Sequence, residues 1–365
     1  MLGILTRQLS DGIALSAAQV GQAVEELVNE GIGAEAKAAF LTAFARKGET
    51  PDEIAGFARV LRGRALRPPL DPVTRSREIL DVVGTGGDGF GTFNLSTAAA
   101  ILAAAGGVVV AKHGNRAVTS QTGSADVLEA LGVPVDLGPE EAARALRDHG
   151  FAFFFAPRYH PAFKHIAPAR RLCAERGQRT IFNYLGPLLN PADPSAQLMG
   201  VPRPDWCEPL ARVLQSLGVR RGMVVCGQVV APTPGGATPG EVAGGWIDEL
   251  STLGPTTIAE FYQDRGFHVS QFSPDLLPLQ PATLGDLKGG TRDENAAILR
   301  RILRGEERGP QRDAVLLNAG AALFVAGQAR TVADGWESAA ALIDRGAAAA
   351  KLEQLTLRSY HSFTR

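Results

Sequence analysis

The sequence is poor in cysteine and has no spacing that suggests a metal site. Only three cysteines occur among the 365 residues, Cys173, Cys207 and Cys226, and the chain contains neither a CxxC nor an HExxH pattern. Three isolated cysteines cannot form a disulfide framework, and this usage is typical of proteins from a reducing compartment. We therefore expect a cytoplasmic protein.

The sequence also lacks a long apolar run and a surplus of charge of either sign. The nearest candidate for a membrane span, residues 101–111, is interrupted by Gly106 and Gly107 and is shorter than the roughly 18 residues that a span needs. The stretch MLGILTRQLSDG has neither the basic nor the apolar region of a signal peptide. With 37 basic and 38 acidic side chains, the chain has no overall field to attract nucleic acid or an anionic membrane. We expect neither among its partners.

Two regions of different secondary structure are predicted. Residues 1–70 contain only helical patterns, with Ser16 as one N-cap and Thr50 followed by Pro51 as another. Over 75–365, β-branched runs alternate with helical ones, and the predicted strands are 79–83, 108–112, 151–157, 196–201 and 222–227. Such alternation is typical of a parallel sheet with helices on both faces. The sequence thus predicts an α/β fold, in which a small all-helical domain precedes a larger α/β domain with a mostly parallel central sheet.

The segment 228–246 departs from this alternation. It contains five glycines and three prolines and shows no apolar periodicity. This composition predicts a mobile loop, which is either a tolerated surface insertion or a lid over a site.

A glycine-rich loop follows the first predicted strand, in the stretch DVVGTGGDGFGTFNLSTAAA. Five of the eight residues from Gly84 to Gly91 are glycine, so the backbone N–H groups can approach and point at a phosphate at the start of a helix. The loop matches GxGxxG, but the next strand ends in Lys112 where a dinucleotide site needs an acidic residue, and no Walker lysine follows. Side chains suited to phosphate oxygens and hydrated Mg²⁺ stand beside the glycines, namely Asp88, Asn94, Ser96 and Thr97.

A second polar loop, KHGNRAVTSQTGSADVLEALG, begins at Lys112 and also joins a strand to a helix. Lys112 and Arg116 supply positive charge, and the neutral donors are Asn115, Thr119, Ser120 and Ser124. Both loops leave the carboxyl ends of neighbouring strands, where open α/β sheets bind ligands. The sequence predicts a ligand that is phosphorylated at more than one place.

The patterns GTGGDGxxTFNxST and KHGNRxVxSxxGSADVLEALG together resemble the anthranilate phosphoribosyltransferase family. The likeness covers nearly the whole chain and includes RTIFNYLGPLLNPA, IDELSTLGPT and NAGAALFVAG. It implies a fold of the nucleoside phosphorylase and phosphoribosyltransferase type. It also implies transfer of the phosphoribosyl group of 5-phosphoribosyl 1-pyrophosphate to the amine of anthranilate in tryptophan biosynthesis, with Mg²⁺ as cofactor. A homodimer through the N-terminal domain, which helices around 160–180 would join, is implied as well.

The resemblance also assigns roles to individual residues. The residues implied to hold 5-phosphoribosyl 1-pyrophosphate are Gly84, Gly87, Asp88, Thr92, Asn94, Leu95, Ser96, Thr97, Lys112, His113, Gly114, Asn115, Arg116, Ala117, Val118, Thr119, Ser120 and Ser124. The implied Mg²⁺ ligands are Ser96, Asp248 and Glu249, and the implied contacts to anthranilate are Gly84, Asn115, His160 and Arg170. Lys112, Asn115 and Arg170 are the expected catalytic residues.

The charges of these groups suit the implied reaction. Pyrophosphate gains charge as it leaves the anomeric carbon, and Lys112, the loop N–H groups and Mg²⁺ are placed to stabilise it. Arg170 suits the carboxylate of the acceptor, because a guanidinium binds a carboxylate through two parallel hydrogen bonds. The sequence offers no Ser-His-Asp set and no carboxylate dyad, so we expect positioning and electrostatics to dominate.

Three features depart from the pattern of the family. A few additional residues separate Arg170 from RTIFN, Cys226 stands where histidine is common, and the insertion 228–246 directly precedes Asp248. All three concern the acceptor or metal side of the implied site.

Three alternatives remain open at this point. A transferase of the same fold for another aromatic acid would have the same donor loops. A pyrimidine nucleoside phosphorylase would not need the Asp248–Glu249 pair, and KHGNR argues against it. A non-catalytic, nucleic-acid-binding relative would lose the glycine loop and gain a basic face, whereas this chain keeps GTGGDG and has a net charge of −1.

Overall fold

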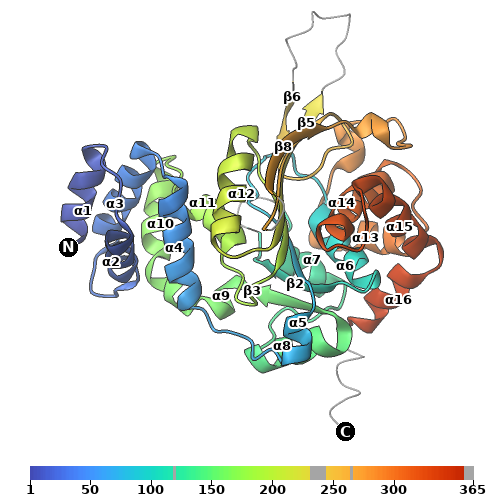
Figure 1. The fold of residues 1–365 in the computed structure, drawn as a ribbon, viewed down its shortest axis with the longest axis horizontal. Helices are drawn as coiled ribbons and strands as arrows, with labels where there is room; N and C mark the ends of the chain where they lie inside the picture. The colour runs from blue at the N-terminus through green and yellow to red at the C-terminus, as the bar shows by residue number, and fades with distance from the viewer. Residues whose placement is uncertain (118–120, 231–243, 264–265, 357–365) are drawn as a thin grey trace, which may run out of the picture.

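A computed structural model describes residues 1–117, 121–230, 244–263 and 266–356 (Figure 1). The predicted donor-binding residues Val118, Thr119 and Ser120 and the centre of the predicted loop 228–246 therefore lie outside the described residues. The strands are β1 (Ile79–Gly84), β2 (Val109–Gly114), β3 (Phe151–Phe155), β4 (Ala196–Gly200), β5 (Arg221–Val230), β6 (Gly244–Ile247), β7 (Thr256–Tyr262) and β8 (Gly266–Phe272).

These strands form one mixed sheet in the order β3-β2-β1-β4-β5-β7-β8, with β6 pairing with β5 beyond this path. The strands β3, β2, β1, β4 and β5 are mutually parallel, while β6, β7 and β8 run antiparallel to their neighbours. In register, Gly84 at the end of β1 lies opposite Gly200 at the end of β4. The carboxyl ends of the parallel strands therefore share one edge of the sheet.

Helices cover both faces of this sheet (Figure 1). The helices of the α/β region are α5 (Pro72–Ser76), α6 (Leu95–Ala105), α7 (Ser124–Ala130), α8 (Pro139–His149), α9 (Ala156–Tyr159), α10 (Ala167–Glu175), α11 (Phe182–Leu185), α12 (Cys207–Ser216), α13 (Arg292–Leu303), α14 (Pro310–Val325), α15 (Val332–Asp344) and α16 (Ala347–Gln354). Single turns of 3-10 helix occur at Pro161–His165, Gly186–Leu188, Pro204–Trp206, Pro274–Leu276 and Leu284–Leu287. No helix in the described part of the chain is long and apolar enough to cross a membrane.

The core of the α/β region depends on the alternation of side chains along each strand. Leu80 and Val82 of β1 lie on the face covered by α6 and α14, where α6 is buried along almost its whole length. The other face of β4 and β5 packs against α12 through residues such as Met199 and Val224. A sheet buried on both faces explains why its parallel strands are continuous apolar runs.

The N-terminal region is a helical bundle of α1 (Leu2–Ser10), α2 (Ala17–Val28), α3 (Ala34–Lys47) and α4 (Pro51–Gly63). Ser16 and Thr50 cap α2 and α4 as predicted, each accepting a hydrogen bond from the backbone of the third helical residue, and Pro51 begins α4. The bundle shares one buried cluster with α10, α11 and α12, so the two regions are joined by a continuous apolar contact. Figure 1 shows α10 lying beside α3 and α4.

Three parts of the predicted secondary structure are wrong. The segment 228–246 is not a loop at its ends, because Gln228–Val230 extend β5 and residues 244–246 belong to β6, which pairs with it. The antiparallel strands β7 and β8 were not predicted from the sequence, because their pairing with each other stabilises residues with weak periodicity. The third strand ends at Phe155 rather than at 157, since Ala156 begins α9.

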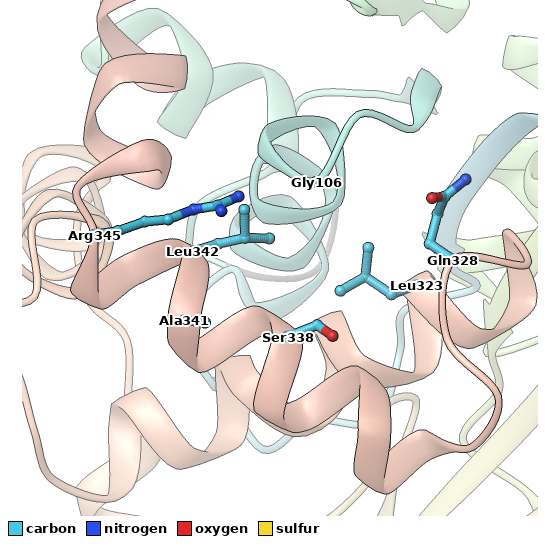
Figure 2. Close-up of a pocket in the computed structure, with 7 residues that line it drawn as sticks. All are labelled: Gly106, Leu323, Gln328, Ser338, Ala341, Leu342 and Arg345. Atoms are coloured by element: carbon cyan, nitrogen blue, oxygen red, sulfur yellow. The ribbon is translucent and has the colours of Figure 1, made fainter.

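A pocket of about 260 Å³ lies at the amino-terminal edge of the sheet (Figure 2). Gly106 at the end of α6 and Leu323 of α14 form one side, and Leu342 of α15 and Arg345 just after it form the other. The glycine loop precedes the opposite end of α6, a helix of 11 residues that is about 16 Å long. This pocket therefore takes no part in the site described below.

Candidate active site

The two polar loops meet at the carboxyl edge of the parallel strands. The glycine loop follows β1 and leads into α6, and the second loop follows the adjacent β2 and leads into α7. Gly86 and Gly87 have φ values of 70° and 83°, a left-handed conformation that strains any residue with a Cβ. Both residues are exposed, so the loop is open to a ligand, although the Gly86 N–H itself is engaged by Asp248. This geometry supports the predicted anion-binding role of the loop.

The acidic pair reaches the glycine loop from a distant part of the chain. β6 leads directly into Asp248, whose Oδ2 accepts a hydrogen bond of 2.7 Å from the Gly86 N–H, 162 residues away in sequence. Glu249 lies next to it and accepts a hydrogen bond from the backbone of Ser96 at the start of α6. The predicted Mg²⁺ ligands Ser96, Asp248 and Glu249 are thus brought together.

The negative charges of Asp248 and Glu249 are destabilised by burial and by neighbouring carboxylates. Burial, and then the neighbouring Asp88, raises the pKa of Asp248 to about 7. Burial and the adjacent Asp248 likewise raise the pKa of Glu249, while Lys112 opposes that shift. Crowded, dehydrated carboxylates are stabilised by a divalent cation, and oxygen is the ligand atom that Mg²⁺ prefers.

No group of three or more His, Cys, Asp or Glu with metal-ligating geometry occurs among the described residues. This observation is compatible with Mg²⁺, which usually keeps several waters and binds through one or two carboxylates together with substrate phosphates. It excludes a closed, all-protein cage from the described part of the chain.

Lys112 lies at the floor of the site, buried to 1% exposure. Its Nζ donates to the Val82 carbonyl oxygen at 2.5 Å and to Ser96 Oγ at 3.3 Å. Burial lowers the pKa of Lys112, and three carboxylates, Asp81, Glu249 and Asp248, oppose that shift. The ammonium group is therefore directed toward the start of α6, between the glycine loop and the acidic pair.

Below Lys112 is a buried polar network that the sequence analysis missed. Asp81, fully buried within β1, accepts hydrogen bonds from His113 N–H at 3.2 Å and from Asn190 Nδ2 at 2.9 Å. Burial raises the pKa of Asp81 to about 6, and the Asn190 hydrogen bond and the Lys112 charge oppose that rise. The signal was present in the sequence, because a carboxylate in the middle of the apolar run ILDVV needs a buried partner.

Two of the predicted acceptor residues, His160 and Arg170, lie in a row of rings that begins at the predicted donor residue His113. The rings of His113 and His160 lie edge to face at 5.4 Å between centroids, and Phe163 stacks on His160 at 5.2 Å. Phe163 meets Phe182 edge to face at 5.7 Å, and the Arg170 guanidinium carbon lies 5.2 Å from the centre of the Phe182 ring. These four rings, those of His113, His160, Phe163 and Phe182, form an aromatic wall between the second loop and Arg170.

Arg170 has no carboxylate partner among the described residues. The residue is exposed, but burial lowers the pKa of its guanidinium, so the charged group is partly withdrawn from water. A guanidinium that stacks on an aromatic ring keeps its planar edge free for a carboxylate. This arrangement suits the predicted role of Arg170 toward the acceptor.

Several of the predicted side chains are engaged elsewhere. Leu95 and Thr97 are buried in the core beneath α6, at 1% and 0% exposure, so only their backbones are near the site. The Asn94 amide donates to the Thr122 carbonyl at 3.2 Å and accepts from Asn295 at 3.0 Å. These contacts hold the turn before α6, and the role of Asn94 toward the donor stays a prediction.

The second loop is held largely by its own side chains. Arg116 forms a two-pronged ion pair with Glu129, with both N···O distances at 2.7 Å, and a further contact of 3.1 Å with Asp126. The Asp126 carboxylate also accepts from the N–H groups of Ala117 and Gly123. The Arg116 charge is therefore neutralised by α7, whereas the sequence analysis expected it to face a phosphate.

Other loop residues are positioned by backbone contacts. Ser124 Oγ donates to the Asn115 carbonyl at 3.4 Å, and a Cβ built on Gly114 would overlap Ser124 Oγ. His113 is buried at 3% exposure, and its Nδ1 lies 3.0 Å from the Gly186 carbonyl, so its ring faces the protein. Gly87, Asp88 and Thr92 remain at least partly exposed at the mouth of the site.

The cysteine at 226 does not contribute to this site. Cys226 lies on β5 with its side chain fully buried in the cluster that includes Cys207 and α12. Burial raises the pKa of its thiol above the ordinary range. The replacement of histidine at this position is therefore a change within the core.

Together, an α/β fold with glycine loops and a carboxylate pair at the carboxyl edge of its parallel strands defines an enzyme that acts on a phosphorylated substrate in the presence of a divalent cation. The glycosyl transferase family, a/b domain, matches residues 76–349, and the glycosyl transferase family, helical bundle domain, matches residues 4–65. The chain belongs to the anthranilate phosphoribosyltransferase family of these glycosyl transferases.

The relatives cover almost the entire chain. An anthranilate phosphoribosyltransferase of Symbiobacterium thermophilum is 47% identical over 352 residues, which are 96% of each chain. The crystal structure of the anthranilate phosphoribosyltransferase of Thermus thermophilus superposes with a TM-score of 0.82 at 42% identity, over 96% of this chain and 98% of the other. The Saccharomyces cerevisiae enzyme in complex with PRPP and Mg gives the same TM-score at 26% identity, over 99% and 98%. These comparisons confirm the predicted fold class and family.

Proposed function

We propose that the chain is an anthranilate phosphoribosyltransferase, which transfers the phosphoribosyl group of 5-phosphoribosyl 1-pyrophosphate to the amine of anthranilate and releases pyrophosphate, a step of tryptophan biosynthesis. The observation that carries this proposal is the meeting of the exposed glycine loop with Asp248, Glu249 and Lys112. These groups supply N–H donors, metal ligands and a cation at one place, as a pyrophosphate ester requires. The names of the relatives support the same reaction.

The donor fits the residues of the glycine loop and the acidic pair. Exposed peptide groups of the glycine loop other than the Gly86 N–H, which Asp248 engages, bind the pyrophosphate oxygens, and Asp248, Glu249 and Ser96 hold Mg²⁺. The raised pKa values of the two carboxylates support this assignment, because a cation between them and the pyrophosphate relieves their repulsion. A bound Mg²⁺ ion neutralises charge on the pyrophosphate leaving group. The structure of the yeast relative in complex with PRPP and Mg supports both ligands.

Lys112, at the floor of the site, assists the departure of pyrophosphate. The Lys112 ammonium group, fixed by Val82 and Ser96, faces the developing charge without having to move. Fixed donors and charges in a dehydrated site stabilise a transition state more effectively than water does. The protein needs no covalent intermediate, since the anthranilate amine captures the ribosyl cation directly.

Anthranilate is held by Arg170 and the aromatic wall. The Arg170 guanidinium binds the acceptor's carboxylate, and Phe182 holds the guanidinium plane. His160 and His113 are kept neutral by burial, so this wall presents an uncharged surface to the aromatic ring. Asn115 at the start of the second loop contributes an amide beside the amine.

The experiment that tests the function is a time course of anthranilate fluorescence with the purified protein. A decay that requires both 5-phosphoribosyl 1-pyrophosphate and Mg²⁺, with pyrophosphate released in equal amount, is the expected result. Binding of the donor in a calorimeter without any decay would show that the loops act as proposed and that the acceptor is another aromatic acid. Absence of donor binding would refute the proposal altogether.

The protein is further proposed to act as a cytoplasmic homodimer, with the N-terminal bundle as the interface. Exposed apolar side chains occur on α1 and at both of its ends, namely Met1, Ile4 and Ile13, at 59%, 58% and 56% exposure. Burial of such side chains against a second copy is favourable. Light scattering of the wild type and of an Ile4→Asp, Ile13→Asp variant tests this assembly.

A further inference from the structure

Phe90 and Gly245 form a contact between the glycine loop and β6 that the sequence does not suggest. A Cβ built on Gly245 would overlap Phe90 Cζ and would lie 3.0 Å from Phe90 Cε2. The edge of the ring therefore rests on the bare backbone of the strand. A side chain at position 245 would push the ring away.

The backbone of Phe90 is fixed on both sides. Its N–H donates to Asp88 Oδ1 at 3.1 Å, and its carbonyl accepts from Lys288 Nζ at 2.7 Å. The following Gly91 carbonyl accepts from the Gly289 N–H at 2.9 Å. Since the backbone cannot shift freely, the position of the ring relative to the loop is set by these bonds.

Gly245 connects the Phe90 contact to the acidic pair, because both lie on or directly after the same strand. It pairs with Val229 of β5, and β6 continues through Ile247, buried at 1% exposure, to Asp248. The other end of the glycine loop is already bound to Asp248 through Gly86. The loop and the strand that carries the acidic pair are thus joined at two points, Gly86–Asp248 and Phe90–Gly245.

We propose that Phe90 is a positioning residue, which braces the glycine loop against β6 and so fixes the separation between the pyrophosphate-binding peptides and the carboxylates of Asp248 and Glu249. The inference rests on the proposed function, because it assigns this separation to the Mg²⁺ and pyrophosphate part of the site. Phe90 acts through the loop and the strand and does not contact the reacting atoms.

The test is calorimetric binding of 5-phosphoribosyl 1-pyrophosphate over a series of Mg²⁺ concentrations, without anthranilate. Phe90→Ala is expected to raise the donor Kd and the half-saturating Mg²⁺ concentration about tenfold, whereas Phe90→Tyr, which keeps the ring, stays within about twofold of the wild type. The KM for anthranilate is expected to stay within the same twofold range, since Arg170 and its aromatic wall are untouched.

A second pair of variants uses the contact itself. Gly245→Ala is expected to weaken donor binding about as much as Phe90→Ala, because the new methyl group displaces the ring. The double variant is expected to match Phe90→Ala alone, since no ring remains to be displaced. Phe267→Ala, a half-buried ring on the far edge strand β8, is the matched control and leaves donor and Mg²⁺ binding unchanged.

Three results would overturn the inference. The first is wild-type binding of the donor and of Mg²⁺ in Phe90→Ala. The second is a double variant whose loss of donor affinity equals the product of the losses in the two single variants. The third is a loss of donor affinity that parallels the loss of thermal stability in Phe90→Ala and in Phe267→Ala alike. A wild-type protein that binds the donor with Mg²⁺ but leaves anthranilate intact refutes the proposed acceptor alone. A wild type that binds no donor refutes the proposed function, and the inference about Phe90 with it.

Discussion

The carboxylate of Asp248 occupies the space that a side chain on Gly84 would need. A Cβ built on Gly84 would overlap Asp248 Oδ2, and one on Gly200, its partner across β1 and β4, would overlap the Asp248 carbonyl oxygen. The ends of two parallel strands are therefore bare so that an acidic residue can lie across them. This packing places a carboxylate within hydrogen-bonding distance of the glycine loop.

Gly84→Ala is expected to displace Asp248 and to lower kcat/KM about 100-fold, because small misplacements of a catalytic group have large effects on rate. Overpacking of this kind also reduces the free energy of unfolding by about 1–3 kcal/mol. Steady-state kinetics and urea unfolding measure the two effects. Gly21→Ala, in open space on α2, is the control and should be neutral or slightly stabilising. Wild-type kinetics for Gly84→Ala would contradict the described contact.

Removing charge from the acidic pair should impair the use of Mg²⁺. Asp248→Asn and Glu249→Gln are each expected to raise the half-saturating Mg²⁺ concentration at least about tenfold, since a charge-assisted contact contributes about 1.5–3 kcal/mol. Activity as a function of Mg²⁺ concentration measures the shift. Glu337→Gln, on the exposed side of α15, should follow the wild-type curve. Unshifted curves for both site variants would rule out the assigned metal ligands.

Arg170 is expected to determine the affinity for the acceptor rather than for the donor. Arg170→Ala should raise the KM for anthranilate about 10–100-fold with little change in the KM for 5-phosphoribosyl 1-pyrophosphate. Arg170→Lys should recover only part of the loss, because lysine cannot bind a carboxylate through two parallel bonds. Its neighbour Arg171, also exposed, provides the matched control Arg171→Ala. An unchanged anthranilate KM in Arg170→Ala would disprove the role.

The paired histidines should make stability fall in mild acid. Burial lowers the pKa of His113 to about 3 and that of His160 to about 4, whereas both titrate near 6.5 in an unfolded chain. At these two positions the unfolded state therefore binds more protons below pH 6.5, and the histidine contribution to the free energy of unfolding decreases as pH falls from about 6.5 toward 4. Each histidine contributes a slope of up to about 1.4 kcal/mol per pH unit.

Urea unfolding at pH 7.5, 6.0 and 5.0 measures this dependence. His160→Asn should remove the contribution of one histidine to the pH dependence of the free energy of unfolding. The other titrating groups are the same in the variant and in the wild type. Asp81, Asp248 and Glu249, whose pKa values burial raises, work in the opposite direction, because at these positions the folded state binds more protons. The comparison between variant and wild type removes their contribution. Equal slopes in the two proteins would contradict a neutral, buried His160.

Local pattern was sufficient for the elements that are stabilised by near neighbours in sequence. The caps at Ser16 and Thr50 involve contacts three residues apart, and the apolar runs of β1 to β5 reflect burial on both faces. The strands β7 and β8 were missed for the opposite reason. Exposed side chains interrupt the pattern of the edge strand β8, and the antiparallel pairing of β7 with β5 and of β8 with β7 decides their conformation.

The contacts of the site's side chains also depend on elements that are distant from the motif. Sequence identified Arg116 as a phosphate ligand from its loop, yet Glu129 on α7 pairs with it. Sequence placed Thr97 at the pyrophosphate, yet the start of α6 turns its side chain into the core. In both cases a neighbouring element competes for the side chain, and the donor contacts of Arg116 and Thr97 stay predictions.

The sequence by itself determined the fold class, the two glycine-containing loops and the residue types that the chemistry needs, because each of these is expressed in short-range periodicity and spacing. Only the tertiary structure decided which of those residues meet. The Gly86–Asp248 hydrogen bond spans 162 positions, and the Phe90–Gly245 contact depends on a strand that pairs far from the loop. Such contacts follow from the packing of the sheet, whose geometry no local stretch of the chain contains.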